Sequence, residues 1–420
     1  TPELNERFAW RVMLLRERSV NAFALPGGYL GLHLGLLAST GSRDELASVL
    51  GHELSHVTQR HISRMIDKGK QQAPLTAAAM VLGVLAASKS PDAANALIIG
   101  GQAAGIQGQL NFSRDMEREA DRIGFGVVTH AGFRVQGFVD MFDKLQQAAR
   151  LNDTGAFPYL RTHPLSTERM ADMQARIPLE SGERKVPVER LSDALMAARA
   201  AVLISPDAAS LTAAQALIAD QGLTSRPLAQ QLTAYYRGAL AAVHNREASL
   251  ARQYVGVIRQ RMAGAAEANQ IDELAREQID WLEAEVALTA RDSSPEALQA
   301  LIQTLSAAAG KSGYRPRPSL MLQAQAALQT GSPAVLRRAS QDLQMLAMKD
   351  RWDALAWQTL SQLHAAMNLR LRSLRDAAEA QAAQFNYPAA LDRLRAAQEL
   401  SRQLGTGASA ADQIEASIVD

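Results

Sequence analysis

Cysteine is absent from all 420 residues of this chain. Without a thiol, the protein can form no disulfide framework, no zinc–thiolate site and no cysteine nucleophile. Aromatic residues are also scarce, at 5% of the sequence, whereas alanine is abundant. Because small side chains let helices approach closely, this composition favours tightly packed helices. It does not identify the cellular compartment.

The chain has almost no net charge, with a formal value of +1 at pH 7. It therefore offers no basic field for nucleic acid, and we expect no nucleic-acid partner. Long hydrophobic runs are also missing. The best candidate, Pro74 to Ala87, has 14 residues and is too short to span a bilayer. A second uncharged stretch, Ala93 to Phe112, is interrupted by asparagine and glutamine. We expect buried or amphipathic helices here and no transmembrane span, which leaves peripheral membrane association open.

The distribution of turns and helical patterns predicts a mostly helical protein with two domains. Residues 1–180 hold most of the glycine turns and the only convincing strand patterns, which predicts an α+β domain. Residues 181–187 form a polar linker, and residues 188–420 show helical patterns alone. The expected strands and turn are residues 10–15, residues 21–25, the turn Pro26-Gly27-Gly28 and residues 29–32.

The C-terminal region consists of helical segments separated by short breakers that contain proline. This alternation is typical of stacked helix pairs. Near the end, Ala378, Tyr387, Ala390 and Ala397 lie at the small and aromatic positions of a tetratricopeptide repeat. We therefore predict an all-α tetratricopeptide-repeat solenoid for residues 188–420. The alternative is an ordinary helical bundle.

The pentapeptide His52-Glu53-Leu54-Ser55-His56 is the most informative pattern in the chain. Two histidines four residues apart lie on one face of a helix, so both can bind one metal ion. Glu53 would lie beside that ion, where it could accept a proton from water. Ser42 is the expected N-cap of this helix, with Glu45 completing a capping box. The alternative is a helix with two surface histidines.

A catalytic zinc ion needs a third protein ligand. The best candidate lies in the segment SRDMEREAD, where Glu117 follows His56 by 61 residues. Asp121 is one helical turn further along, on the same face. Glu117 could bind the metal while Asp121 accepts a hydrogen bond from the free ring nitrogen of a ligand histidine. The alternative is an exposed helix of alternating charges.

Three strings occur in order along the chain: NAFALPGG, ELASVLGHELSHVTQRH and SRDMEREAD. Together they resemble the zinc metallopeptidase family that includes the HtpX heat-shock protease and the CAAX prenyl proteases. The resemblance covers residues 8 to about 175. It implies one Zn²⁺ per chain, bound by His52, His56 and Glu117, with Asp121 orienting a ligand. Glu119 does not match the ligand position.

Two further segments match this family. Arg161-Thr162-His163-Pro164, followed by Arg169, resembles a segment that the family uses to stabilise the transition state near the zinc. Asn21 corresponds to a polar position facing the same site. Amide, imidazole and guanidinium groups can each donate a hydrogen bond to a developing oxyanion. From the residues alone, a turn asparagine, a loop histidine and a surface arginine are the more ordinary interpretations.

The expected reaction is hydrolysis of peptide bonds in a protein substrate, with Glu53 as the proton acceptor. The strand beside Pro26-Gly27-Gly28 could be an open sheet edge, to which an extended substrate adds as a further strand. A helical-repeat domain without a membrane span resembles the periplasmic branch of the family. That resemblance implies a periplasmic enzyme acting on unfolded or stalled outer-membrane β-barrel proteins. Its repeats would contact the β-barrel assembly machinery.

The resemblance also suggests a form of regulation. In the periplasmic branch, the histidine that matches His163 can occupy the fourth zinc position and silence the enzyme. The apolar insertion from Pro74 to Gln109 lies between the two halves of the metal site and is the expected lid. A competing hypothesis comes from another class of protein. It is a chaperone or scaffold whose helical repeats carry the function and whose metal site is vestigial.

Overall fold

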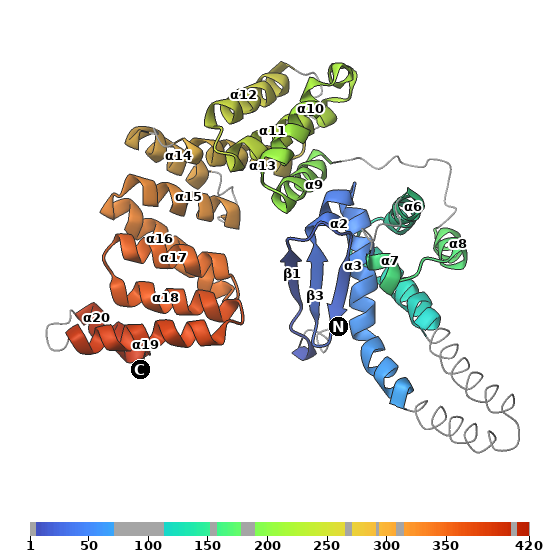
Figure 1. Ribbon diagram of the computed structural model, residues 1–420, viewed down its shortest axis with the longest axis horizontal. Helices are drawn as coiled ribbons and strands as arrows, with labels where there is room; N and C mark the ends of the chain where they lie inside the picture. The colour runs from blue at the N-terminus through green and yellow to red at the C-terminus, as the bar shows by residue number, and fades with distance from the viewer. Residues whose placement is uncertain are drawn as a thin grey trace, which may run out of the picture. The chain divides into compact units, whose positions relative to one another are not determined.

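The computed structural model describes most of the chain in separate ranges. The predicted lid, Pro74 to Gln109, and the predicted linker, residues 181–187, lie outside them. Within these ranges most residues are helical, and the strands form one three-stranded sheet (Figure 1). The predicted fold class, mostly α with a small sheet, is confirmed. The described ranges are residues 6–70, 113–151, 158–177, 190–264, 271–290, 294–307, 315–404 and 410–419.

The chain divides into two compact units. One comprises Thr1–Arg237 with Asn269–Ala275, and the other comprises Gly238–Ala268 with Arg276–Asp420. None of the described helices is long and apolar enough to cross a membrane. The domain boundary at residues 181–187 remains a prediction.

The sheet has the strand order β1-β3-β2 and mixed direction. Central β3 (Tyr29–His33) runs parallel to β1 (Arg11–Leu15) and antiparallel to β2 (Ala22–Leu25), within one residue of the predicted strands. Gly28 follows β2 with a φ of +89°, and a Cβ there would lie 2.8 Å from Cβ of Phe8. Glycine is therefore required at this turn, because both the backbone angle and the space exclude a side chain.

Two helices follow the sheet, and the second carries the histidine motif. They are α2 (Leu34–Ser39) and α3 (Arg43–Thr58). Ser42 caps α3 as predicted, since its hydroxyl accepts from the backbone N–H of Glu45 at 3.3 Å. The Glu45 carboxylate does not complete the predicted capping box at the N-cap. It accepts instead from the N–H of Gly41 at 2.8 Å and from Lys144 Nζ at 2.7 Å.

A helix over residues 113–130 packs closely on α3. The contact is made by two glycines, since a Cβ on Gly124 would lie 3.0 Å from the backbone of Gly51 and from the N atom of His52. A Cβ on Gly51 would in turn lie 2.8 Å from the Val128 side chain. Larger residues at either position would push the helices apart. This close packing holds the helix with Glu117 against the histidine helix.

Three further helices follow in the unit that contains the sheet. They are α6 (Gln136–Leu151), α7 (Pro158–Thr162) and α8 (Thr167–Arg176). Ser166 caps α8 by accepting from the N–H of Arg169 at 3.2 Å. One buried cluster joins the sheet, α2, α3, α6 and α7, and a second joins α3, α6 and α8. The metal motif therefore lies on a helix whose opposite faces are packed in hydrophobic core.

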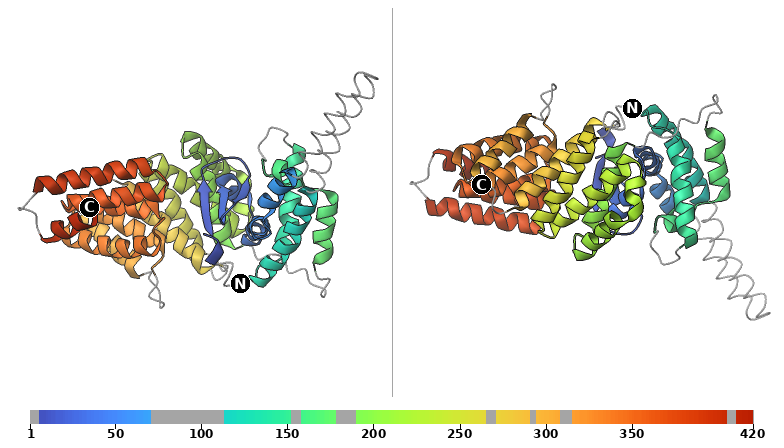
Figure 2. Two further views of the ribbon diagram at one scale, coloured as in Figure 1. Left: turned by 90° about the horizontal axis from the view of Figure 1, so that it is seen from below. Right: turned by 90° about the horizontal axis from the view of Figure 1, so that it is seen from above.

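The remaining elements are helical. In the C-terminal unit, helices α14 to α19 each pack against the next, and they lie side by side in both views of Figure 2. This arrangement agrees with the predicted helical solenoid. The elements are α9 (Leu191–Ile204), α10 (Ala208–Ala219), η1 (Gln221–Ser225), α11 (Leu228–His244), α12 (Ala248–Gly264), α13 (Glu273–Thr289), α14 (Pro295–Ala307), α15 (Arg317–Thr330), α16 (Pro333–Lys349), α17 (Ala354–Ala366), α18 (Arg370–Ala383), α19 (Tyr387–Leu404) and α20 (Ala410–Val419).

The residues of the predicted repeat signature differ in their burial. Ala378, Ala390 and Ala397 are buried between neighbouring helices, as their small size suggested. Tyr387 begins α19 and is 54% exposed, so it does not fill the core of a helix pair. The tetratricopeptide assignment itself remains a prediction.

Candidate metal centre

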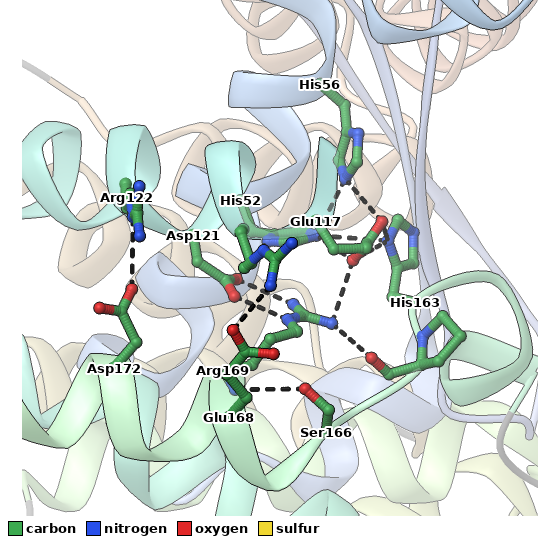
Figure 3. A network of polar contacts seen from close by, with 12 residues as sticks. His52, His56, Glu117, Asp121, Arg122, His163, Ser166, Glu168, Arg169 and Asp172 are labelled. Carbon is green, nitrogen blue, oxygen red and sulfur yellow. Dashed lines mark hydrogen bonds and ion pairs between the residues drawn. The ribbon is translucent and has the colours of Figure 1, made fainter. Parts of the chain in front are cut away.

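Helix α3 places the two motif histidines on one face, one turn apart. His52 Nε2 and His56 Nε2 lie 2.9 Å from each other. His52 is almost fully buried, whereas His56 is partly exposed at the edge of the site. The alternative of two surface histidines is therefore excluded, because both rings point into the protein toward the helix over residues 113–130 (Figure 3).

Glu117 brings a carboxylate to this pair from the neighbouring helix. Its Oε2 lies 3.3 Å from His52 Nε2, and its Oε1 lies 3.4 Å from His56 Nε2. Glu117 is 4% exposed, so the interpretation as an exposed charged helix does not hold at this position. Glu119, two residues further, points elsewhere and pairs with Arg64 at 2.8 Å.

His163 reaches the same point from the loop that follows α7. Its Nδ1 lies 3.0 Å from Glu117 Oε1 and 3.2 Å from His52 Nε2. Its other nitrogen, Nε2, lies 3.4 Å from Glu53 Oε1. The Tyr159 ring packs against the imidazole, with a centroid separation of 4.7 Å, which holds it in this orientation.

These groups form a donor set that suits a divalent metal. One ligand atom each from His52, His56, Glu117 and His163 lie within 4.8 Å of one another. Ligand bonds to zinc are about 2.0–2.1 Å, so neighbouring ligand atoms around it lie about 3.3 Å apart. The separations of 2.9 to 3.4 Å found here are close to that spacing. Nitrogen and carboxylate ligands of this kind suit zinc.

Glu53 adds a buried carboxylate next to the ligand cluster. Its Oε1 is buried and has no hydrogen-bond partner in the described part of the chain. Leaving a carboxylate oxygen buried in this way is costly unless another group approaches it. This orphaned oxygen, 3.4 Å from His163 Nε2, is the position expected of a group that exchanges a proton with water beside a metal.

Burial and close contacts shift the pKa values of three residues in the site. Burial opposes protonation of His52, but hydrogen bonds to Asp121 and Glu117 outweigh it and raise the pKa to about 10. Burial and the neighbouring His52 lower the pKa of His56 to about 2. Burial opposes ionisation of Glu117, but hydrogen bonds from His163 and His52 hold its pKa far below the usual value. A bound metal ion would displace the proton on His52, because ligand imidazoles are neutral.

Asp121 and Arg169 form a buried support beneath the ligands (Figure 3). His52 Nδ1 lies 2.9 Å from Asp121 Oδ1, as expected for a carboxylate that orients a ligand histidine. Arg169 donates to both oxygens of Asp121, from Nε at 2.7 Å and from Nη2 at 2.8 Å. Its Nη1 donates to the carbonyl of Pro164 at 2.8 Å and lies 3.1 Å from Glu117 Oε2. Arg169 is therefore a buried residue and not a surface arginine.

The geometry bears on the oxyanion role expected for Arg169. All three of its nitrogens are directed at protein groups rather than at an open space. We infer that Arg169 positions Asp121, Glu117 and the loop that carries His163. The oxyanion role expected for Arg169 remains a prediction.

Asn21 is not brought into this cluster by any contact in the described residues. It lies immediately before β2, and its carbonyl accepts from the N–H of His33 at 3.1 Å. Its side-chain Oδ1 is buried and has no hydrogen-bond partner there. An amide oxygen without a partner agrees with the expectation that Asn21 is a polar residue facing the site. Its contact with the reacting group remains a prediction.

The substrate edge expected at Pro26-Gly27-Gly28 remains a prediction. Pro26-Gly27-Gly28 connects β2 to β3, and the carbonyls of Gly27 and Gly28 already accept from Ala9 N at 2.7 Å and Arg11 N at 2.9 Å. The space beside Gly28 is filled by the chain's own Phe8. Strands β1 and β2 are the two edges of the described sheet, and β2 lies beside α3, so a strand added to β2 would lie next to the histidine helix.

His61 is a site residue that the sequence reasoning missed. Its Nδ1 lies 2.8 Å from His56 Nδ1, and its Nε2 lies 3.3 Å from Glu119 Oε2. With His56 Nε2 directed at the metal site, its Nδ1–H donates to His61, whose Nε2–H donates to Glu119. This chain of bonds fixes the tautomer of His56, as Asp121 does for His52. The spacing from His56 to His61 in the quoted string HELSHVTQRH was the available signal.

Replacing Asp121 by asparagine is expected to weaken zinc binding by about tenfold or more, because the His52 ring loses its orienting carboxylate. Titration with a competing chelator will measure this change. Asp172→Asn is the matched control, because Asp172 pairs with Arg122 and Arg176 at the surface and has no contact with the ligand cluster among the described residues. Equal zinc affinity in the two variants would contradict the assigned role of Asp121.

Replacing His61 by alanine should also weaken zinc binding, by several-fold, since His56 would lose the acceptor for its Nδ1–H. His130→Ala provides the comparison, because His130 is exposed and, within the described ranges, bonds to the carbonyl of Gly126 away from the metal centre. His61→Gln, which keeps an acceptor, should recover part of the loss. If His61→Ala binds zinc as tightly as the wild type, the relay has no role.

Comparison with known proteins identifies relatives of the segment that carries this site. Residues 3–177 match the family model described as Peptidase family M48. Over 163 residues the chain is 40% identical to the Putative beta-barrel assembly-enhancing protease of Vibrio cholerae, covering 39% of this chain and 34% of that protein. It is 39% identical to the Beta-barrel assembly-enhancing protease of Escherichia coli over 163 residues, covering 39% and 33%.

A mitochondrial relative shows the same segment. The Mitochondrial metalloendopeptidase OMA1 of Arabidopsis thaliana is 34% identical over 164 residues, or 39% of this chain and 31% of that protein. The matched part thus spans about a third of these relatives. It contains His52, Glu53, His56, Glu117 and His163. Residues 3–177 of this chain therefore form a domain of peptidase family M48, a metallopeptidase family.

Proposed function

We propose that the protein is a zinc-dependent endopeptidase. The observation that carries this proposal is the convergence of His52, His56 and Glu117 beside the orphaned carboxylate oxygen of Glu53. A zinc ion bound there would supply Lewis acidity and make water a stronger acid. Glu53 takes a proton from the attacking water and passes it to the leaving amine, so one carboxylate serves as base and then as acid.

The other residues of the centre prepare this reaction. Asp121 keeps the His52 ring in its ligand orientation, and Arg169 holds Asp121 and Glu117 in place. Because the network is buried, its charges interact strongly and its geometry is rigid. An extended substrate adds to the edge of β2, which presents main-chain groups beside the histidine helix. Such binding selects unfolded or unpaired strands over folded ones.

The names of the relatives bear on the class of substrate. We propose that this chain acts in the bacterial periplasm on unfolded or stalled outer-membrane β-barrel proteins. The relatives from Vibrio cholerae and Escherichia coli are named for β-barrel assembly, which supports this class of substrate. The C-terminal helices would dock the enzyme to the β-barrel assembly machinery. Stacked helix pairs offer extended surfaces that suit such docking.

We propose further that His163 is a latch. Its Nδ1 occupies the fourth corner of the ligand cluster, and its Nε2 approaches Glu53. In this position the imidazole excludes the attacking water from the fourth corner of the ligand cluster and from Glu53. Opening of the loop between α7 and α8 would free the corner and start catalysis.

Removal of the metal tests the proposed chemistry directly. Treatment with a zinc chelator is expected to abolish cleavage of a denatured barrel protein and to lower the melting temperature, because a metal bound to the folded state stabilises it. One equivalent of Zn²⁺ should restore both, whereas Mg²⁺ should restore neither. Cleavage that persists after complete removal of zinc would contradict the proposal.

A further inference from the structure

A cavity of about 410 Å³ adjoins the metal centre on the side of His56. Its walls come from three places in the sequence. Phe8 and Leu25 contribute apolar surface from the start of the chain and the end of β2, and Val57 contributes it from α3. Because His56 forms part of the wall, a side chain bound here belongs to a residue close to the scissile bond.

The charged groups of this cavity have one sign. Arg7 and Arg60 line it, and no aspartate or glutamate among the described residues does. Both arginines are exposed, and neither has an ion-pair partner among the residues that the structure describes. Unpaired guanidinium groups beside apolar walls favour a ligand that combines methylene groups with a carboxylate.

The backbone holds Arg60 at this wall in an unusual conformation. Its φ is +55°, in the left-handed region that favours glycine or asparagine. Arg60 lies between the end of α3 and the helix over residues 61–70, and its N–H donates to the carbonyl of Val57 at 3.0 Å. The same turn brings His61 to His56. Arg60 therefore occupies a backbone position that glycine or asparagine would adopt with less strain.

The cavity also continues from the proposed substrate strand. Leu25 is the last residue of β2, and Gly27 lies in the turn that follows. Both residues line the cavity. Side chains of an added strand alternate between its two faces. A substrate paired with β2 would therefore direct one side chain near the scissile bond into this space.

We propose that this cavity is a substrate subsite that selects glutamate or aspartate, with Arg60 as the main determinant and Arg7 as its partner. The inference rests on the proposed peptidase function and adds a substrate preference to it. The methylenes of a glutamate side chain would pack on the apolar walls while its carboxylate pairs with the guanidinium groups.

Peptide binding tests the subsite separately from catalysis. Two peptides that differ only by Glu and Gln at the position nearest the scissile bond are titrated against the full chain carrying Glu53→Gln. We expect the Glu peptide to bind about five- to tenfold more tightly, with the difference decreasing at high salt. Arg60→Asn, which tolerates the left-handed backbone, should remove the difference, Arg60→Lys should retain part of it, and Arg60→Glu should reverse it.

Arg114→Glu is the matched control, since Arg114 is exposed on the helix with Glu117 but does not line the cavity. It should leave the preference unchanged. Equal binding of the two peptides, a preference that survives Arg60→Glu, or tighter binding of an aromatic residue at this position would each overturn the subsite. If binding discriminates as expected but wild-type protein with zinc cleaves no peptide, the proposed hydrolysis fails and the acidic subsite stands.

Discussion

The variant Glu53→Gln is expected to lose proteolytic activity by about a thousandfold while keeping its zinc. Glutamine has nearly the same size and shape, so the packing around position 53 is preserved. It cannot accept a proton, so the attacking water is no longer activated and the leaving amine is no longer protonated. Cleavage of a denatured barrel protein, measured beside zinc content and melting temperature, checks this result.

Glu168→Gln provides the comparison for this experiment. Glu168 lies on the surface at the start of α8 and pairs with Arg118, so its loss should leave cleavage unchanged. Substantial cleavage by Glu53→Gln would rule out the proposed mechanism. If the inactive variant supports barrel assembly in cells as well as the wild type, the helical repeats carry the function and the scaffold hypothesis is favoured.

The variant His163→Ala is expected to raise basal proteolysis by about tenfold or more. In the structure the imidazole fills the fourth corner of the ligand cluster, with Nδ1 only 3.2 Å from His52 Nε2. A side chain that ends at Cβ leaves that corner to water, and each 1.4 kcal/mol lost from the closed state corresponds to about a tenfold gain in open enzyme. Initial rates on an unfolded substrate, without any activating partner, measure the gain.

A second measurement separates the latch from the oxyanion role. In cobalt-substituted protein, loss of the His163 ligand should change the visible absorption spectrum, because the coordination of the metal changes. A purely catalytic histidine would leave the resting spectrum unaltered and lower the rate. Reduced cleavage by His163→Ala with an unchanged spectrum would therefore refute the latch and support oxyanion stabilisation.

Several parts of the fold and the centre were predictable from local sequence. The three strands lie within one residue of their predicted positions, and Ser42 caps α3. His52 and His56 lie together because helical hydrogen bonds place residues four apart on one face. The position of Glu117 in SRDMEREAD made it the best candidate for the third ligand, but an exposed charged helix stayed open as the alternative. The family strings then favoured Glu117, since nothing local shows which of several carboxylates faces the histidines.

Other features could not be predicted because they depend on surroundings far away in the sequence. The oxyanion role expected for Arg169 followed from a motif, whereas its buried pairing with Asp121 depends on where α8 meets the helix over residues 113–130. Tyr387 matched an aromatic repeat position, yet it is exposed. A pattern of residue types cannot show which face of a helix will find a neighbour.

Sequence alone determined the local chemistry of this protein: a helix with two imidazoles on one face, a carboxylate next to the first, and a second acidic helix. Only the tertiary structure decided which atoms meet. Gly51 and Gly124 let two helices approach until Glu117 reaches the histidines, and the turn at Arg60 brings His61 behind His56. The reason is physical. Helix periodicity is set by hydrogen bonds four residues apart, whereas a binding site is set by packing between segments that the chain's order does not relate.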